Sequence, residues 1–330
     1  MSTLLTVRDL RAYYIISKNI AVRAVDGVNL DIMMDEVLGV VGESGCGKTT
    51  LANTIIMNIR PPLHIIGGDV VIEGRNITRM RREELREKVW GRLISIIPQS
   101  ALNSLPPVKR IGDFMFDVMR YRLGVKDKRK ALELARQRLE DVKLPPETLG
   151  MYPHELSGGM KQRVVIAIAT LLEPRLLIAD EPTSALDVST QKVILRILLE
   201  LKRRRILRSI LFITHDIAIL RQIADRIAVM YAGKVIEVGS MEEILDNPLH
   251  PYTKALINSV ITPEPEIRRR GLSYIPGRPP SLIRPPPGCR FHPRCSYAMR
   301  ICQQREPPLC EVKEGHWVAC HLYLEESNRG

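Results

Sequence analysis

The stretch that decides the fold is VLGVVGESGCGKTT, residues 37–50. An apolar run, Val37–Val41, precedes a segment that matches the pattern G-x-x-x-x-G-K-[ST] at every fixed position, and a helix-forming run follows from Thr50. Glycines in such a loop let successive backbone N–H groups point inward at an anion, and the helix N-terminus adds a partial positive charge. The stretch therefore predicts a strand, a phosphate-binding loop and a helix.

The side chains of this loop are those that a nucleoside triphosphate requires. Lys48 is placed to reach the β- and γ-phosphates, and the Thr49 hydroxyl is placed to ligate Mg²⁺. The alternative is a glycine-rich turn that matches by chance, which the strand before it and the helix after it disfavour. The predicted nucleotide-binding residues here are Gly42, Glu43, Ser44, Gly45, Cys46, Gly47, Lys48, Thr49 and Thr50.

A second part of the predicted site is a pair of acids that follows the apolar run 176–179. Asp180 is expected to hold the Mg²⁺ shell, and Glu181 to polarise a water molecule for in-line attack on the γ-phosphate. Alone, two acids after an apolar strand would indicate a structural ion pair. Together with residues 42–49 they predict hydrolysis of the triphosphate.

The order of apolar and amphipathic stretches indicates an α/β domain from about residue 4 to 240. A mainly parallel sheet is expected, with two antiparallel strands near the N-terminus and a hairpin that turns at residues 232–233. Between residues 97 and 157 the strand signal disappears, and residues 127–144 repeat apolar positions at helical spacing. This predicts a helical insertion at about 100–156. The predicted strands are 4–10, 22–32, 37–41, 93–97, 176–179, 210–214, 227–230 and 235–238.

Composition limits the class of protein. The 330 residues include 45% hydrophobic and 26% charged side chains, which is typical of a globular chain, and the longest apolar run, 164–172, is too short to span a membrane. With Arg8 and Asp9 early in the chain, no signal peptide is expected, so the sequence predicts a cytosolic protein. The net charge of +12 favours an acidic partner, either nucleic acid or the inner face of a membrane.

The C-terminal part has a different composition. Eleven of the 23 prolines lie between residues 263 and 308, which predicts a linker, and five of the six cysteines follow residue 288. In a cytosolic protein such cysteines favour a metal over disulfides. Four thiolates can bind zinc or an iron–sulfur cluster, and the absence of a C-x2–4-C pair favours the cluster. The zinc alternative adds three candidate ligands, His292, His316 and His321.

Further motifs resemble the nucleotide-binding subunits of ABC (ATP-binding cassette) transporters. LSGGMKQR, residues 156–163, is similar to the signature sequence of that superfamily, and SALD, residues 184–187, to its D-loop. Gln99 matches its Q-loop glutamine and His215 its switch histidine. The resemblance implies a P-loop NTPase fold with a helical subdomain at about 100–156. It also implies a head-to-tail dimer that encloses two ATP molecules.

The resemblance assigns roles to these motifs. It implies that Ser157, Gly158 and Gly159 bind the γ-phosphate of ATP held by the other subunit, and Ser157 is also expected to cap the following helix. It implies that His215 contacts the γ-phosphate and steadies Glu181, whereas the alternative is a core histidine. Gln99 would ligate Mg²⁺ or the attacking water and connect the core to the helical insertion. The expected adenine-stacking residue is Tyr14, with Tyr13 as the alternative.

The tail resembles one subfamily, the oligopeptide/dipeptide importer ATPases. The segments that carry this resemblance are NPLHPYTKAL at 247–256, GCRFHPRC at 288–295 and GHWVAC at 315–320. It implies a [4Fe-4S] cluster held by four cysteines with Cys310 as the spare, and a domain order of 1–245, a linker at 246–288 and a metal-binding extension at 289–330. NSLPP, residues 103–107, departs from the subfamily at the surface expected to meet the membrane subunit. The implied ligands are Cys289, Cys295, Cys302 and Cys320.

The function that this resemblance implies is hydrolysis of ATP, with Mg²⁺, to power import of di- or oligopeptides at the cytoplasmic face of the cell membrane. The implied partners are a second ATPase subunit, expected to be a paralogue, two transmembrane permeases and an extracellular substrate-binding protein, with no nucleic acid. Alternatives are an importer for nickel or oligosaccharides, a soluble ABC-type ATPase acting on nucleic acid or ribosomes, and a regulatory subunit that binds ATP without hydrolysing it.

Overall fold

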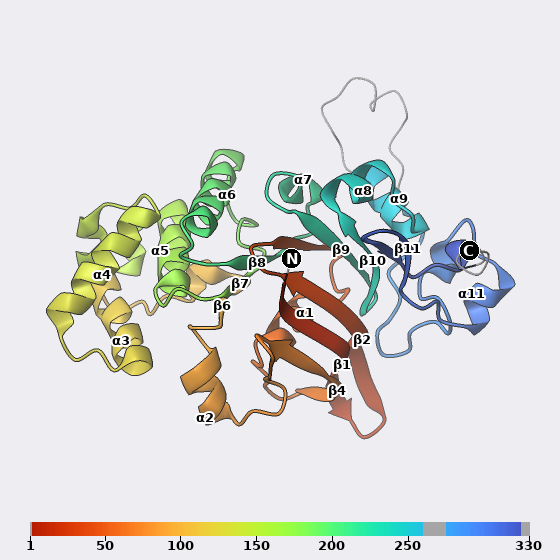
Figure 1. Cartoon of the computed structure of the whole chain (residues 1–330), viewed down its shortest axis with the longest axis horizontal. Helices are drawn as coiled ribbons and strands as arrows, with labels where there is room; N and C mark the ends of the chain where they lie inside the picture. The colour runs from red at the N-terminus through yellow and green to blue at the C-terminus, as the bar shows by residue number, and fades with distance from the viewer. Residues whose placement is uncertain (1, 260–274, 325–330) are drawn as a thin grey trace. The chain divides into compact units, whose positions relative to one another are not determined.

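The computed structural model describes residues 2–259 and 275–324. Within these ranges the contacts divide the chain into two compact units, each assembled from segments that are distant in sequence. Unit 1 contains residues 2–5, 32–37 and 71–213, and unit 2 contains residues 6–31, 38–70, 214–259 and 275–324. Most helices and strands of both units are labelled in Figure 1.

The core of unit 1 is a parallel sheet with strand order β8-β7-β6. Residues Ile97 and Ala179 are partners across β6 and β7, and Asp180 and Ile213 are partners across β7 and β8. Every residue of β7 and β8 is buried, which explains the apolar runs 176–179 and 210–213 within them. The bounds are β6 (Ile94–Ile97), β7 (Leu176–Asp180) and β8 (Ser209–Ile213).

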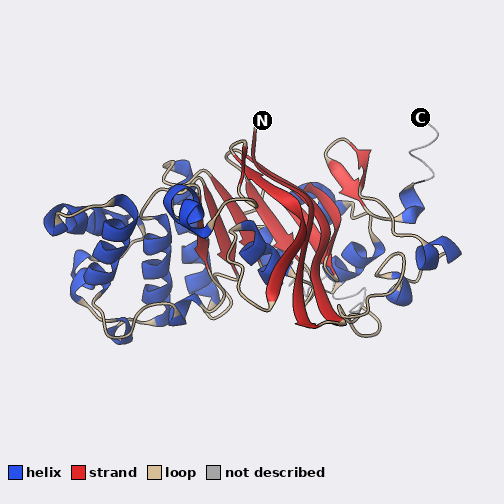
Figure 2. Cartoon of the chain, turned by 90° about the horizontal axis from the view of Figure 1, so that it is seen from below, coloured by secondary structure: helices blue, strands red, loops and turns tan. Residues whose placement is uncertain are grey.

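Most helices of unit 1 lie together at the left of Figure 1, where α3, α4, α5 and α6 are labelled, beside the short parallel strands (Figure 2). Local signals set their ends: the Asp127 carboxylate caps α4, and Gly124, with φ 70°, ends α3. The bounds are α2 (Arg82–Glu84), the π-helical turn η1 (Leu85–Val89), α3 (Ile111–Leu123), α4 (Lys128–Asp141), α5 (Gly158–Thr170) and α6 (Val188–Arg203), with short 3₁₀ turns η2 (Ala101–Asn103), η3 (Pro146–Gly150) and η4 (Pro153–Glu155).

Unit 2 contains a mixed sheet that joins the predicted core to the cysteine-rich tail. Strand β3 is parallel to β9, and β9, β10, β12 and β11 then follow in antiparallel order. The tail therefore adds two strands to this sheet, which the sequence analysis did not predict. The bounds are β3 (Val37–Val41), β9 (Arg226–Tyr231), β10 (Lys234–Ser240), β11 (Cys310–Lys313) and β12 (His316–Val318).

A second sheet has the order β2-β1-β4, and β4 ends in a short pairing with β5. Only residues 18 and 19 separate β1 from β2, so these two adjacent strands run antiparallel, as predicted. The bounds are β1 (Thr3–Ser17), β2 (Ile20–Met33), β4 (Leu63–Ile72) and β5 (Arg75–Asn76). The helices of unit 2 are α1 (Lys48–Ile55), α7 (Ile217–Leu220), α8 (Met241–Asp246), α9 (Pro251–Asn258) and α11 (Arg300–Gln304), with turns η5 (His292–Arg294) and η6 (His321–Tyr323).

Most expected elements are present. A strand covers most of each predicted run, the hairpin turns between β9 and β10, and α4 falls within the predicted helical stretch 127–144. The predicted linker, 246–288, contains helix α9, and its residues 260–274 lie outside the described chain. Across the ranges that the structure describes, the helices are all too short or too polar to cross a membrane.

Candidate nucleotide-binding and hydrolysis site

The predicted phosphate loop begins where β3 ends, and close packing explains its glycines. A Cβ atom on Gly47, which has φ 108°, would lie 1.9 Å from the carbonyl oxygen of Ala24. A Cβ atom on Gly42 would lie 2.1 Å from the carbonyl oxygen of Met230. Only glycine fits at these two positions, because the backbone of neighbouring strands fills the space where a side chain would go.

Lys48 is the first residue of α1 and is buried. Its ammonium group donates hydrogen bonds to the carbonyl oxygens of Gly42 at 2.6 Å and Glu43 at 3.1 Å. The charge is therefore held over the loop, at the helix end where the partial positive charge already favours an anion. This is the arrangement that binding of a triphosphate requires.

The two candidate tyrosines of β1 have different partners. The Tyr14 hydroxyl lies 3.1 Å from the Thr50 hydroxyl, so this side chain is beside the helix that follows the loop. The Tyr13 hydroxyl donates to Asp26, and burial together with this carboxylate raises the pKa of Tyr13 to about 12. Both hydroxyls have a polar partner, and that of Tyr14 is Thr50, a residue of the predicted nucleotide site, which favours Tyr14 over Tyr13.

His215 belongs to unit 2 and comes two residues after the end of β8. The backbone N–H of its neighbour Thr214 donates to the carbonyl oxygen of Val40 at 3.1 Å. Val40 lies on β3, one residue before that strand ends at the phosphate loop. Within unit 2, the chain at His215 therefore lies next to β3, the strand that leads into residues 42–49.

The predicted catalytic acids lie in unit 1 at the carboxyl end of its sheet. Gln99 follows β6 by two residues, and Asp180 is the buried last residue of β7. Because β6 and β7 are parallel and adjacent, the residues after each strand lie at the same edge. This is the edge at which open α/β sheets bind their ligands.

Glu181 has an uncommon backbone conformation. Its φ is +48°, in the left-handed region that residues other than glycine seldom adopt, and its N–H donates to the carbonyl oxygen of Ile213 at 2.9 Å. Conformations of this kind cost of order 1–3 kcal/mol and gather at functional sites.

The signature segment forms the N-terminus of α5. The Ser157 hydroxyl accepts a hydrogen bond from the Met160 N–H at 3.3 Å, so the predicted helix cap is present. Ser157 and Gly158 are exposed, and no described residue outside this helical turn has an atom within 4 Å of the position of a Cβ on Gly158. This end of the helix is therefore open for a ligand from another molecule. The D-loop residue Asp187 likewise caps α6.

The cysteines of the tail gather in unit 2. Burial, together with the smaller effect of Cys289, Cys295 and Cys302, raises the pKa of Cys320 to about 12. Burial and two of these neighbours likewise raise the pKa of Cys289 to about 11. The fifth candidate, Cys310, lies on β11 opposite Val318. Four cysteines therefore share one electrostatic environment, in which a bound cation or cluster would stabilise their thiolates.

No group of three or more His, Cys, Asp or Glu side chains in residues 2–259 and 275–324 has a geometry that could hold a metal ion. Hydrogen bonds also weaken the zinc alternative for His316, in which both ring nitrogens face a carboxylate. The two ring nitrogens of His316 face Glu237 at 2.8 Å and Glu243 at 3.5 Å. One ring nitrogen of His292 lies 2.9 Å from the carbonyl oxygen of Cys289, and one of His321 lies 2.9 Å from that of Arg305.

Sequence reasoning did not identify three residues that contact the phosphate loop or the strands beside it. Arg294 forms an ion pair with Glu43, Tyr252 accepts a hydrogen bond from the Glu43 N–H, and Arg290 forms an ion pair with Asp26. These residues lie within two of the three tail segments that resemble the importer subfamily, 247–256 and 288–295. The sequence signal for these contacts was the presence of Arg290 and Arg294 among the cysteines, and it did not identify the distant residues that they contact.

Comparison with known proteins defines the class. The model of the ABC transporter family matches residues 25–184. The dimeric ATP-binding cassette MJ0796, solved in a post-hydrolysis state with ADP and Pi, has a TM-score of 0.62 and 25% identity, covering 72% of this chain and 99% of that chain. The cbiO1 protein of Clostridium perfringens has the same TM-score with 28% identity, over 75% of this chain and 92% of its own. The chain has the fold of an ABC ATPase.

Relatives along the whole chain define the family. The dipeptide transport ATP-binding protein DppD of Caldanaerobacter subterraneus subsp. tengcongensis is 44% identical over 98% of each chain. The oligopeptide transport ATP-binding protein AppF of Bacillus subtilis is 40% identical over 97% of this chain and 98% of its own. The model of the oligopeptide/dipeptide transporter C-terminal region matches residues 236–302. The chain belongs to the ATP-binding subunits of oligopeptide and dipeptide ABC transporters, and it is an ATPase coupled to transport.

Proposed function

We propose that this ATPase powers the import of di- or oligopeptides from the cytoplasmic face of the cell membrane. The single observation that carries the proposal is identity of 44% over nearly the whole chain to a dipeptide transport ATP-binding protein, tail included. The match to the transporter C-terminal region supports it independently. Neither finding favours an ATPase that acts on nucleic acid or ribosomes.

For the chemistry we propose that ATP binds on residues 42–50 with adenine on Tyr14, and that Glu181 takes the proton of the attacking water. Asp180, Thr49 and Gln99 would hold Mg²⁺, which neutralises charge on the phosphate oxygens. His215 would contact the γ-phosphate and orient Glu181. The buried Lys48 ammonium, held by the carbonyl oxygens of Gly42 and Glu43, supports the binding of ATP on this loop.

The partner ATPase would complete the site. Ser157, Gly158 and Gly159 lie at an exposed helix N-terminus, where they would bind the γ-phosphate held by the other subunit. ATP would then close the dimer by contacting Lys48 of one subunit and Ser157 of the other, and hydrolysis would release it. The dimeric cassette MJ0796 supports such a dimer, and we expect the second subunit to be a paralogue.

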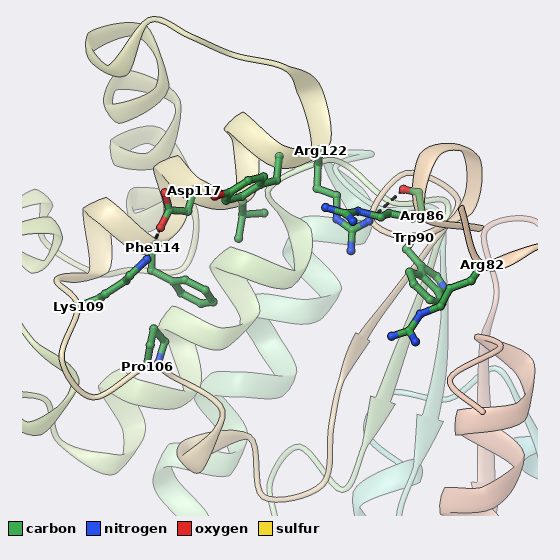
Figure 3. Close-up of a pocket in the computed structure, with 10 residues that line it drawn as sticks. Arg82, Arg86, Trp90, Pro106, Lys109, Phe114, Asp117 and Arg122 are labelled. Carbon is green, nitrogen blue, oxygen red and sulfur yellow. Dashed lines mark hydrogen bonds and ion pairs between the residues drawn. The ribbon is translucent and has the colours of Figure 1, made fainter. Parts of the chain in front are cut away.

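The permease contact is proposed for a cavity of about 510 Å³ in unit 1 (Figure 3). Three aromatic side chains, Trp90, Phe114 and Tyr121, line it together with four cations and one acid. The Arg122 guanidinium lies over the Trp90 ring, 5.9 Å from its centroid. A cavity lined by aromatic and cationic side chains suits a short amphipathic helix with acidic residues, presented by the permease. Pro106, from the segment that departs from the subfamily, also lines the cavity.

We also propose that Cys289, Cys295, Cys302 and Cys320 hold a [4Fe-4S] cluster, whose role is to hold the tail together. Such a cluster keeps its four thiolates farther apart than a single ion does. The four cysteines influence one another but do not form a site for a single metal ion, and such an arrangement is compatible with a [4Fe-4S] cluster. The cluster would add stability to a segment with few apolar residues of its own.

Copurification tests the proposed assembly. Native membranes are solubilised gently, this chain is captured, and its partners are identified by mass spectrometry. We expect a second ATP-binding cassette and two multi-span membrane proteins, with an extracellular binding protein attached in some preparations. Recovery only from the soluble fraction, with RNA or ribosomal proteins, would overturn the importer assignment.

A further inference from the structure

The cysteine-rich tail reaches back to the phosphate loop through one buried arginine. We propose that Arg294 is a positioning residue for ATP binding: it fixes Glu43, the second residue of the loop, and neutralises its charge beside the bound phosphates. The inference rests on the proposed assignment of residues 42–50 to ATP. It gives the tail a direct part in the nucleotide site.

The contact between the two side chains is bidentate. Nη1 of Arg294 lies 2.7 Å from Oε2 of Glu43, and Nη2 lies 3.0 Å from Oε1. The Arg294 side chain is only 5% exposed, whereas that of Glu43 is 24% exposed. Two parallel charge-assisted hydrogen bonds in a largely buried setting fix both the distance and the orientation of the carboxylate.

The guanidinium has an acceptor for each of its five N–H groups. Besides the two bonds to Glu43, Nε donates to the carbonyl oxygen of Pro276 at 2.7 Å, Nη1 to the Tyr231 hydroxyl at 3.2 Å, and Nη2 to the carbonyl oxygen of Ile275 at 3.4 Å. A buried group with all its donors satisfied has one favoured orientation. Lysine at this position would keep the positive charge but could not donate the two parallel hydrogen bonds to the carboxylate.

Glu43 is also held through its backbone. Its N–H donates to the Tyr252 hydroxyl at 2.9 Å, and its carbonyl oxygen accepts from Lys48 Nζ at 3.1 Å. The residue that Arg294 fixes thus carries one of the carbonyl groups that positions the lysine of the loop. A shift of Glu43 would move an acceptor of the group expected to reach the phosphates.

Packing explains why Arg294 sits where it does. The Phe291 ring contacts Tyr231 and Tyr252, with centroid separations of 5.2 and 5.5 Å. Arg290, one residue earlier, is buried and donates to both the Asp26 carboxylate and the carbonyl oxygen of Ala232. The segment that carries Arg294 is therefore anchored on β9, α9 and β2 before it reaches the loop.

The charge balance predicts the effect of removing the arginine. A carboxylate in the second position of an anion-binding loop opposes the phosphates unless a cation neutralises it. Without Arg294 the Glu43 carboxylate would remain half-buried and unneutralised by that ion pair. Affinity for ATP should fall, and removing the Glu43 charge as well should restore much of it. A purely structural role for Arg294 predicts no such recovery.

The test is the dissociation constant of MgATP, measured by calorimetry on the full chain. Arg294→Gln is expected to weaken binding about tenfold, a change of about 1.4 kcal/mol. The double variant Glu43→Gln, Arg294→Gln should bind within about threefold of Glu43→Gln alone. Arg300→Gln, at an exposed arginine of the same tail, is the matched control and should bind as the wild type does.

Two further variants make the result decisive. Arg294→Lys preserves the positive charge and replaces Arg294→Gln in the test if that variant does not fold. An affinity for MgATP between those of the wild type and Arg294→Gln, or below that of the wild type if Arg294→Gln does not fold, supports the proposal. Lys48→Ala tests the underlying site, because retention of ATP affinity there would contradict the assignment of residues 42–50 itself. If Lys48→Ala loses ATP while both Arg294 variants bind normally, or if the double variant shows no recovery, the role of Arg294 is overturned.

Discussion

The side chain of Arg294 donates two hydrogen bonds to the carboxylate of Glu43 across 251 residues of sequence. One partner belongs to the cysteine-rich tail and the other to the phosphate loop. The same part of the tail supplies β12, which pairs with β10 of the sheet in unit 2. The tail is therefore built into the unit that carries the loop.

Replacing the proposed general base separates binding from turnover. Glu181→Gln is expected to bind MgATP as the wild type does, because the side chain keeps its size and the loop is untouched. The hydrolysis rate should fall by about 10²–10⁴-fold, the usual contribution of a positioned acid or base. Calorimetry and a phosphate-release assay on the assembled transporter measure the two quantities. Wild-type turnover by this variant would exclude the general-base role.

A buried histidine predicts how stability depends on pH. His250 caps α9 by accepting the Tyr252 N–H at 3.0 Å, and burial lowers its pKa from 6.5 to about 4. The unfolded chain therefore binds a proton below pH 6.5 that the folded chain takes up only near pH 4. The contribution of neutral His250 to the free energy of unfolding is therefore fully present above pH 6.5, and it is lost as the pH falls toward 4.

The loss between pH 7 and pH 5 should be about 2 kcal/mol in the free energy of unfolding. Urea titrations of the wild type and His250→Asn at both pH values measure it. Asparagine keeps an oxygen that can cap the helix but does not titrate, so the variant should lose about 2 kcal/mol less over this range. Equal pH dependence of the two proteins would show that His250 does not remain neutral in the folded chain.

The proposed cluster predicts which cysteines matter for bound iron. Anaerobically purified Cys302→Ser should lose iron, sulfide and the broad visible absorption, because one of four thiolate ligands is missing. Cys310→Ser is the matched control and should retain all three. A wild-type protein with stoichiometric zinc and no iron would contradict the cluster, and equal loss in both variants would contradict this choice of ligands.

The cavity of unit 1 predicts a variant that uncouples hydrolysis from transport. Tyr121 lines the cavity and is 64% exposed, so Tyr121→Ala should leave the fold and ATP affinity intact. Peptide-stimulated hydrolysis by the assembled transporter should fall on the order of tenfold, as expected for an aromatic anchor of an interface. Tyr297→Ala, at a tyrosine 60% exposed in the tail, is the control. Full stimulation in Tyr121→Ala would place the permease elsewhere.

The parts of the fold that the sequence predicted are those with local signals. The run 37–41 is a strand because it is apolar throughout, and Asp127 marks the start of α4 by capping it. The glycine pattern identified the phosphate loop because packing leaves no room for a Cβ at Gly42 and Gly47. Each of these signals lies within a few residues of what it specifies.

The contacts of the tail were not predictable for the opposite reason. Strand β12 has three residues, too few for a periodic pattern, and its pairing with β10 joins Val318 to Glu237. The partners of Arg290 and Arg294 lie more than 250 residues away, and spacing alone gives no pairing rule at that distance. Charge and burial specify these pairs only after the chain has folded.

Uptake of a labelled peptide tests the central claim most directly. The complete transporter, with its permeases and binding protein, is reconstituted in proteoliposomes with the ATP-binding subunits exposed to added MgATP. We predict that a labelled di- or oligopeptide accumulates only with ATP, and that Glu181→Gln abolishes this accumulation. ATP hydrolysis that drives no peptide uptake, or that responds to another cargo instead, would contradict the account.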